Sequence, residues 1–342
     1  MRRVGVKEFL QEEKYIPIID VRSPGEYENG HIIGSKNLPL FTDEERAEVG
    51  TTYTKVGKGE AVELGLEIVG PKMNELAKKA RAIGIDGKLK THCWRGGMRS
   101  EKMAWLFELV GLDVTLLEGG YKAYRQQLLY DFKNIQNLIV LQGPTGSGKT
   151  GVLHELRNCG EQIIDLENRA NHKGSAFGAL GMGEQPSTTQ FQNLLYDDLL
   201  QLNPSKRIWI ESESLSIGRV YLPETLWENM NNSNVIELNV DKSIRSKRIV
   251  EEYGHFDKEV LINSIEKIKS RFGGNRAMES MQLLKENKLE EVALLLLDYY
   301  DKAYSFSKNK YKKKEIAVLD SDTGDPSKNA SELIKTANNL SL

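Results

Sequence analysis

The stretch Gly143-Pro144-Thr145-Gly146-Ser147-Gly148-Lys149-Thr150 decides the fold of the second half of the chain. It fits G-x-x-x-x-G-K-[ST], the pattern of a loop that cradles phosphate. Residues 138–141 before it predict a strand, and residues 152–156 after it predict a helix. Its glycines let backbone N–H groups close around phosphate oxygens, and the N-terminus of the helix favours an anion. The predicted phosphate-binding residues are Gly143, Thr145, Gly146, Ser147, Gly148, Lys149 and Thr150, with Lys149 on the terminal phosphates and Thr150 offering its hydroxyl to a magnesium ion.

Further apolar runs follow this loop, and helical patterns separate them. The runs cover residues 162–165, 207–211, 235–240 and 315–320. This alternation predicts a parallel sheet covered by helices. Glu211 and Glu213 come at the end of one strand, where phosphate-loop proteins normally hold an Asp for magnesium or water. Two glutamates in that place argue against vigorous ATP hydrolysis.

Two segments of the second half carry more basic side chains than a purely structural role requires. Residues 169–178 mix cationic, aromatic and small side chains, which suits phosphate contact and base stacking or, equally, a mobile lid. The helix that opens at Asp241 has a basic face, which suits a lid, an RNA backbone contact or a solvated surface. The candidate RNA or lid contacts are Arg169, His172, Lys173, Phe177, Arg219, Arg245 and Arg248.

Length and composition bound the remaining possibilities. The 342 residues predict two domains, and we place them at residues 1–131 and 132–342. The net charge of -2 provides no global basic field, so an RNA site must be a local patch. Two cysteines exclude a disulfide scaffold and favour a reducing compartment. We expect a cytoplasmic protein with no membrane partner and no tightly bound cofactor, and apart from the magnesium ion at the phosphate loop we assign no metal site.

Cys93 comes at the end of a predicted strand, residues 89–92, and a glycine-containing loop leads from it into a helix. Backbone N–H groups, the helix N-terminus and two arginines in such a loop favour the thiolate, which is the reactive form. The same donors would bind an incoming oxyanion. We therefore predict Cys93 as a nucleophile, and the predicted oxyanion loop is Trp94, Arg95, Gly96, Gly97, Met98 and Arg99.

The first half resembles the rhodanese domains. The resemblance rests on Asp20-Val21-Arg22-Ser23-Pro24, on Gly30-His31-Ile32, and on Cys93 at the place of the persulfide cysteine. It implies that Asp20, Arg22 and His31 hold loops in place. The Cys-x5-Arg spacing of Cys93 and Arg99 is also that of protein-tyrosine phosphatases, although no general acid is evident. The fold class is thus α/β: an N-terminal rhodanese-like domain followed by a P-loop NTPase-like, nucleotide-kinase-type, parallel-sheet domain.

Taken whole, the chain resembles the tRNA 2-selenouridine synthase family. The Cys93 loop, residues 172–178 and Ile217-Gly218-Arg219-Val220 carry this resemblance. It implies an enzyme that replaces sulfur by selenium at the wobble 2-thiouridine of tRNA, through a geranylated intermediate. The co-substrates would be selenophosphate, supplied by selenophosphate synthase, and geranyl diphosphate.

Three questions stay open from the sequence. The phosphate loop suits geranyl diphosphate, a nucleotide or a tRNA phosphate. A rhodanese-type sulfurtransferase with an appended NTPase remains an alternative, as does a non-catalytic module in which both loops bind ligands.

Overall fold

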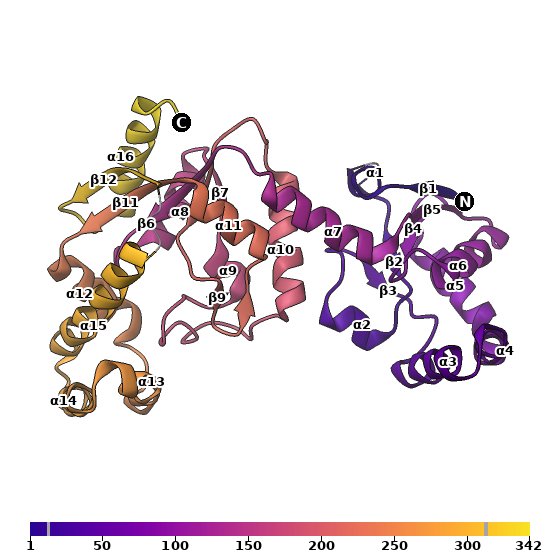
Figure 1. Ribbon diagram of the computed structural model, residues 1–342, viewed down its shortest axis with the longest axis horizontal. Coiled ribbons are helices and arrows are strands. Elements are labelled where there is room, and N and C mark those ends of the chain that lie inside the picture. The colour runs from indigo at the N-terminus through magenta and orange to yellow at the C-terminus, as the bar shows by residue number, and fades with distance from the viewer. Residues whose placement is uncertain (12–13, 311–313) are drawn as a thin grey trace. The chain divides into compact units, whose positions relative to one another are not determined.

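A computed structural model describes residues 1–11, 14–310 and 314–342 of the chain. The chain folds as two compact units, Met1–Asp131 and Phe132–Leu342. Each unit is a parallel sheet with helices packed on it (Figure 1).

The sheet of the first unit has five parallel strands in the order β1-β5-β4-β2-β3. Its strands are β1 (Arg2–Val4), β2 (Ile18–Asp20), β3 (Lys36–Asn37), β4 (Lys88–His92) and β5 (Asp113–Leu117). The edge strand β3 is short, because only Lys36 and Asn37 pair with β2. Cys93 follows β4, so it lies at the carboxyl edge of the sheet.

Helices cover this sheet and build its core. They are α1 (Val6–Gln11), α2 (Pro24–Asn29), α3 (Asp43–Lys55), α4 (Lys58–Val69), α5 (Met73–Ile83), α6 (Met98–Leu109) and α7 (Gly120–Lys133). Residues of α5 and α6 pack against Ile19, Leu89 and Val114 of the sheet. A short 3-10 turn, η1 (Gly70–Lys72), separates α4 from α5. The interruption has a local cause, because Pro71 has no N–H to donate within a helix.

The sheet of the second unit has five parallel strands in the order β12-β11-β6-β8-β7. Its strands are β6 (Leu138–Gln142), β7 (Gln162–Ile164), β8 (Ile208–Glu211), β11 (Asn234–Val240) and β12 (Lys314–Ser321). The predicted parallel sheet with covering helices is confirmed. A separate two-stranded ribbon, β9 (Ser216–Ile217) with β10 (Val220–Tyr221), follows β8.

Two groups of helices belong to this unit. Those associated with the sheet are α8 (Lys149–Asn158), α9 (Leu166–Ala170), α10 (Thr188–Gln201), α11 (Glu224–Asn232) and α16 (Pro326–Asn339). Of these, α8 and α16 pack on one sheet face, against Ile139, Trp209 and Leu238. The others are α12 (Lys242–Tyr253), α13 (Lys258–Phe272), α14 (Gly274–Lys285) and α15 (Leu289–Lys310), which lie together between β11 and β12 in the chain (Figure 1). They share a second apolar core that includes Ile265, Leu284 and Leu296.

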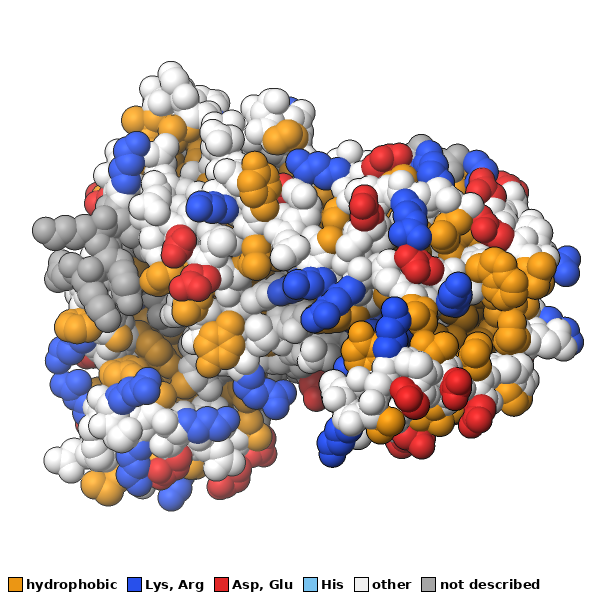
Figure 2. All heavy atoms as spheres, turned by 45° about the vertical axis from the view of Figure 1, so that its right-hand side comes forward, with side chains coloured by type: hydrophobic (Ala, Val, Ile, Leu, Met, Phe, Trp, Pro, Cys, Tyr) orange, Lys and Arg blue, Asp and Glu red, His pale blue; other side chains and the backbone are white. Residues whose placement is uncertain are grey.

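The surface agrees with the near-balanced charge of the sequence. Acidic and basic side chains are interspersed over the face drawn in Figure 2. Within the ranges given above, no helix is both long enough and apolar enough to traverse a bilayer.

Candidate functional site

Cys93 lies between strand β4 and helix α6, in a loop whose backbone donors are unused. Its side chain is buried, and Ser100 Oγ lies 3.1 Å from Cys93 Sγ as a hydrogen-bond donor. Across residues 1–11, 14–310 and 314–342, no group accepts a hydrogen bond from the backbone N–H of any residue from Trp94 to Met98. A Cβ added at Gly97 would meet nothing within 4 Å, so that side of the loop is open. The loop thus presents consecutive free N–H groups beside a thiol, which is an arrangement that binds anions.

Backbone contacts with the start of α7 fix the shape of this loop. Tyr121 N donates to Cys93 O and Lys122 N donates to Trp94 O, each at 2.9 Å. Gly96 and Gly120 both have positive φ, and a Cβ on Gly120 would lie 2.4 Å from Gly96 N. Only glycine fits at either position, because a side chain would force the loop away from α7.

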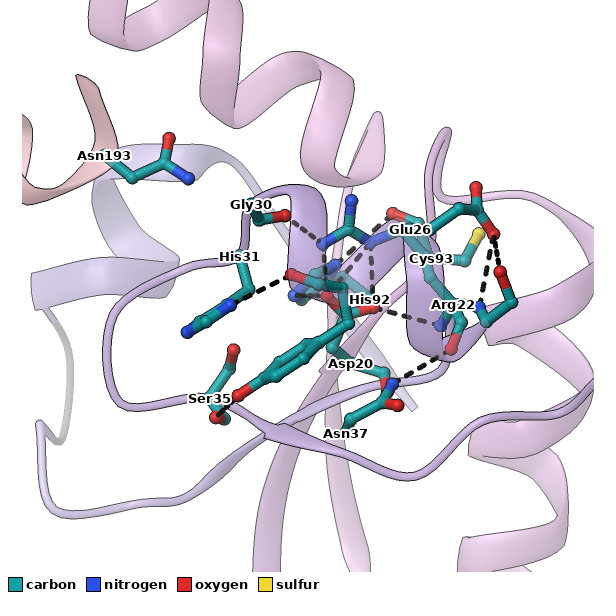
Figure 3. A network of polar contacts seen from close by, with 12 residues as sticks. Asp20, Arg22, Glu26, Gly30, His31, Ser35, Asn37, His92, Cys93 and Asn193 are labelled. Atoms are coloured by element: carbon teal, nitrogen blue, oxygen red, sulfur yellow. Dashed lines mark hydrogen bonds and ion pairs between the residues drawn. The ribbon is translucent and has the colours of Figure 1, made fainter. Parts of the chain in front are cut away.

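A buried polar network lies beside Cys93 (Figure 3). Arg22 Nε donates to both carboxylate oxygens of Asp20, at 3.0 and 2.9 Å, and Arg22 Nη2 donates to Gly30 O at 2.7 Å. The Arg22 guanidinium also lies 3.9 Å from the ring centroid of Tyr121. Burial lowers the pKa of His92, so this ring next to Cys93 is neutral. Asp20 and Arg22 compensate each other's charge and form hydrogen bonds with each other. They connect the loops around Cys93, as the sequence resemblance implied.

The two arginines of the predicted oxyanion loop have different surroundings. Arg99 Nη1 donates to Glu26 Oε2 at 2.7 Å, so its charge is compensated by a carboxylate. Arg95 is exposed and has no ion-pair partner among the residues that the structure describes. Trp94 and Met98 are exposed as well. The cation left to attract an anion to this loop is therefore Arg95.

The phosphate loop connects β6 to α8, as the sequence predicted. Gly146 and Gly148 have φ of 80° and 82°, values that favour glycine. Lys149 Nζ donates to Gly143 O at 3.0 Å. The Ser147 hydroxyl is buried without a hydrogen-bond partner in the described part of the chain. The backbone thus has the curvature of a cradle that takes a phosphate group.

Glu167 is a site residue that the sequence reasoning missed. Thr150 Oγ1 donates to Glu167 Oε2 at 2.7 Å, and Glu167 N donates to Glu211 Oε1 at 2.8 Å. Burial raises the pKa of Glu211 well above its ordinary value and also raises the pKa of Glu167. An available signal was the pair Asp165 and Glu167 directly after a strand, at the edge that carries the phosphate loop.

Arg245 and Arg248 were candidates for lid arginines, RNA contacts or solvated residues of α12, and the structure places neither on a solvated face. Arg245 is buried, and its guanidinium donates to both carboxylate oxygens of Asp301 at 2.9 and 3.0 Å. Arg248 Nη1 donates to Gly146 O at 2.8 Å, and Arg248 Nη2 donates to Gly324 O. A Cβ on Gly148 would lie 2.4 Å from Arg248 Nη1, so the guanidinium lies directly against the phosphate loop.

Two residues of the predicted RNA or lid segment are also corrected. Arg169 belongs to helix α9 and pairs with Asp198, with Arg169 Nε 2.7 Å from Asp198 Oδ2. Phe177 is buried in the core of α13–α15, so its ring is not available to stack on a base.

The other three candidate RNA or lid contacts are Lys173, His172 and Arg219, and each has a different environment. Lys173 pairs with Glu252 beside the phosphate loop. His172 Nδ1 accepts from Gly174 N at 3.2 Å and so holds a turn. Arg219 is exposed at the turn between β9 and β10, and its N–H donates to Gln185 Oε1 at 2.8 Å.

A cavity of about 620 Å³ opens at the phosphate loop and has two chemically different parts. The polar part is formed by the loop together with Thr150, Glu167, Glu213 and Arg248. The apolar part enters the second core, and its lining includes Ile265, Leu284 and Leu296. No cluster of three or more His, Cys, Asp or Glu residues that could hold a metal ion occurs in the described ranges. The cavity therefore suits a ligand with a phosphate head and an apolar body.

A cysteine loop on one parallel sheet and a phosphate loop on another define a rhodanese-like domain joined to a P-loop domain. The family models agree: the rhodanese-like domain matches residues 5–127, and the tRNA 2-selenouridine synthase AAA domain matches residues 136–325. The chain belongs to the tRNA 2-selenouridine synthase family.

Named relatives carry the same description. A tRNA 2-selenouridine synthase of Shewanella pealeana is 35% identical over 86% of this chain and 89% of its own length. One from Shewanella loihica is 35% identical over 85% of this chain and 86% of its own. One from Nitrosomonas europaea is 40% identical over 69% of this chain, and the match spans 63% of that relative.

Proposed function

We propose that this chain is a tRNA-modifying enzyme that converts wobble 2-thiouridine to 2-selenouridine, with geranyl diphosphate and selenophosphate as co-substrates. Its family and the names of its relatives support the tRNA reaction. One observation carries the assignment of the co-substrate to the second unit. The cavity at the phosphate loop continues into an apolar helical core, as a prenyl diphosphate requires.

The geranyl chain suits the apolar part of the cavity. Burial of its ten carbons would contribute roughly 8 kcal/mol at about 0.8 kcal/mol per carbon, before the costs of ordering the ligand are subtracted. The diphosphate would lie in the cradle against Lys149 and the backbone N–H groups of the loop. Glu211 is poorly suited to activate water, because burial and the neighbouring carboxylates raise its pKa and so disfavour the ionised form that would accept a proton. A site for displacement of diphosphate needs the cradle and not a hydrolytic carboxylate.

A magnesium ion fits the polar end of this cavity as an auxiliary ligand. The Thr150 hydroxyl and the Glu167 carboxylate provide the oxygen ligands that Mg²⁺ prefers. Those two side chains would hold the ion together with diphosphate oxygens. When bound, the ion would neutralise charge on the departing diphosphate.

In the first step the thiouridine sulfur attacks the terminal carbon of the geranyl chain. The new S–C bond forms while the C–O bond to the diphosphate breaks. The proton of the pyrimidine N3 leaves to solvent, and the product is S-geranyl-2-thiouridine with free diphosphate. Lys149 and the loop N–H groups would stabilise the leaving diphosphate as its charge develops.

In the second step selenium from selenophosphate replaces the geranyl-sulfur group, with Cys93 as the nucleophile. Selenium has the same oxidation state in selenophosphate and in 2-selenouridine, whereas a selenium atom bound to the Cys93 sulfur would require an oxidant. We therefore place Cys93 at C2 of the pyrimidine. Its S–C2 bond forms as geranylthiol leaves with a proton, and selenophosphate then attacks C2 through selenium and releases the Cys93 thiolate. Water removes the phosphoryl group as phosphate, and the Cys93 loop would bind that group.

Mass spectrometry of the wobble nucleoside tests the proposal. The intact protein is incubated with thiolated tRNA, selenophosphate and geranyl diphosphate, and 2-selenouridine is the expected product. Lys149→Ala should lose geranyl diphosphate binding, because the variant removes the cation of the cradle. Unchanged affinity of that variant would take the phosphate loop out of this role.

A further inference from the structure

Helix α6 carries an exposed apolar stripe that begins at the Cys93 loop. Met98, Trp105 and Leu109 are 45%, 52% and 65% exposed, and they share one helix face with Lys102. The opposite face is buried in the core of the unit through Met103, Ala104 and Phe107. From Met98 to Leu109 the stripe is about 16 Å long, at about 1.5 Å per residue.

The stripe continues into the loop through Trp94, which is 38% exposed. Tyr121 packs against the Trp94 ring with a centroid distance of 5.7 Å, and Arg22 lies 6.0 Å from the centroid of the same ring. These two contacts fix the orientation of the Trp94 ring. The exposed part of the ring can therefore stack on a planar partner.

The charges along this surface are positive on balance. Glu101 of α6 pairs with Arg3 at 2.8 Å, and Glu108 pairs with the N-terminal amino group. By contrast, Arg95, Lys102 and Lys122 are exposed, and the described residues provide none of them with a carboxylate partner. The acidic groups are thus neutralised locally, while the three cations are left for a partner.

Exposed aromatic rings among unpaired cations match the chemistry of single-stranded nucleic acid. Every base has a flat face that stacks on an aromatic ring, and the phosphates between the bases require cations. Double-stranded RNA offers phosphates but keeps its bases stacked, so it would leave Trp94 and Trp105 unused. A neutral apolar partner would leave Arg95, Lys102 and Lys122 without compensation.

We infer that the surface formed by Trp94, Arg95, Met98, Lys102, Trp105 and Lys122 binds the unstacked bases of a single-stranded RNA loop. The inference rests on the proposed function and deepens it, because it assigns the anticodon loop of the substrate to the face that leads to Cys93. Trp105 and Lys102 would position the RNA and take no part in bond making.

Binding of a fluorescent anticodon stem–loop RNA by the full-length protein tests this surface. Trp105→Ala should weaken binding about 10- to 100-fold, the effect of losing one stacked base. Trp105→Phe keeps an aromatic ring and should restore most of the affinity. Lys102→Gln should reduce the slope of log K against log salt by about 0.7, which corresponds to one phosphate contact on a single strand.

Tyr53→Ala and Lys55→Gln on helix α3 are the matched controls, because both are exposed and lie outside this surface. They should bind the RNA like wild type, and thermal unfolding should confirm that all variants are folded. Wild-type affinity of Trp105→Ala and Lys102→Gln would overturn the inference and leave the proposed function intact. Failure of the wild-type protein to bind thiolated tRNA would instead contradict the proposed function.

A protein-docking role gives a different result. In that case the variants would bind RNA normally and lose 2-selenouridine formation only when selenophosphate synthase supplies the selenium. That outcome would also overturn the RNA inference.

Discussion

Arg245 and Arg248 are three residues apart on helix α12, yet they have different electrostatic surroundings. Asp301 compensates the buried Arg245. Arg248 makes hydrogen bonds to two carbonyl oxygens and has no carboxylate partner in the described part of the chain. The sequence shows a basic helix face but cannot show this difference, because Asp301 is 56 residues away in the chain.

Arg248 should therefore be a second cation for the diphosphate. We expect Arg248→Gln to weaken inorganic diphosphate binding about 10- to 100-fold, since hydrogen bonds to charged groups contribute roughly 1.5–3 kcal/mol. Titration calorimetry measures this directly. Lys247→Gln on the exposed face of the same helix is the control and should bind like wild type. Equal affinity of the two variants would mean that Arg248 only supports the loop.

Glu211 should make stability depend on pH. Its pKa is raised in the folded protein, so the folded state holds a proton that the unfolded chain releases above about pH 4.5. Stability should therefore fall as the pH rises from that value toward the folded pKa. Glu211→Gln keeps an acceptor for Glu167 N and removes the ionisation, so its unfolding midpoint in urea should fall less over this range. Parallel pH profiles of the two proteins would show that Glu211 does not titrate in this way.

At the scale of elements, the sequence predicted the strands and helices that local sequence patterns determine. The G-x-x-x-x-G-K-[ST] pattern and the apolar runs predicted β6, α8 and the parallel sheet of the second unit. The cavity was not predictable in this way, because the phosphate loop, residues 212–216 and helices α12 to α15 line it together from distant parts of the chain. Periodicity identifies apolar faces but not the space left between them.

Ala293 on α15 tests the apolar part of the cavity. It is buried and lines the cavity, so Ala293→Leu should occupy volume that the geranyl chain needs. We expect at least a tenfold loss of geranyl diphosphate affinity with unchanged affinity for inorganic diphosphate, both by calorimetry. Ala303→Leu, on an exposed position of the same helix, is the control. Equal losses for both ligands would indicate a distorted site and not a filled cavity.

At the scale of the molecule, each unit carries its own candidate site loop. The family resemblance in the sequence indicated both loops because each is contained in a short segment. Residues brought together from separate segments, such as Thr150 with Glu167 and Glu211, required the structure.

This separation predicts that the two steps can be interrupted independently. Cys93→Ala should bind tRNA and accumulate geranylated 2-thiouridine without forming 2-selenouridine, because its phosphate loop is intact. Lys149→Ala should accumulate neither product from 2-thiouridine. Mass spectrometry of the wobble nucleoside distinguishes the two patterns. Formation of 2-selenouridine by Cys93→Ala would show that this cysteine is not the nucleophile.

The cavity beside α13–α15 has a consequence for protein turnover. Helices that border an open cavity lack packing partners on that side, so they open locally at a lower free energy than fully packed helices, and opened helices are substrates for proteases. A prenyl chain in that space would act as an additional core side chain supplied from outside the sequence. Geranyl diphosphate should then protect residues 258–310 from limited proteolysis far better than inorganic diphosphate does. The lifetime of the protein would in that way follow the supply of the proposed co-substrate.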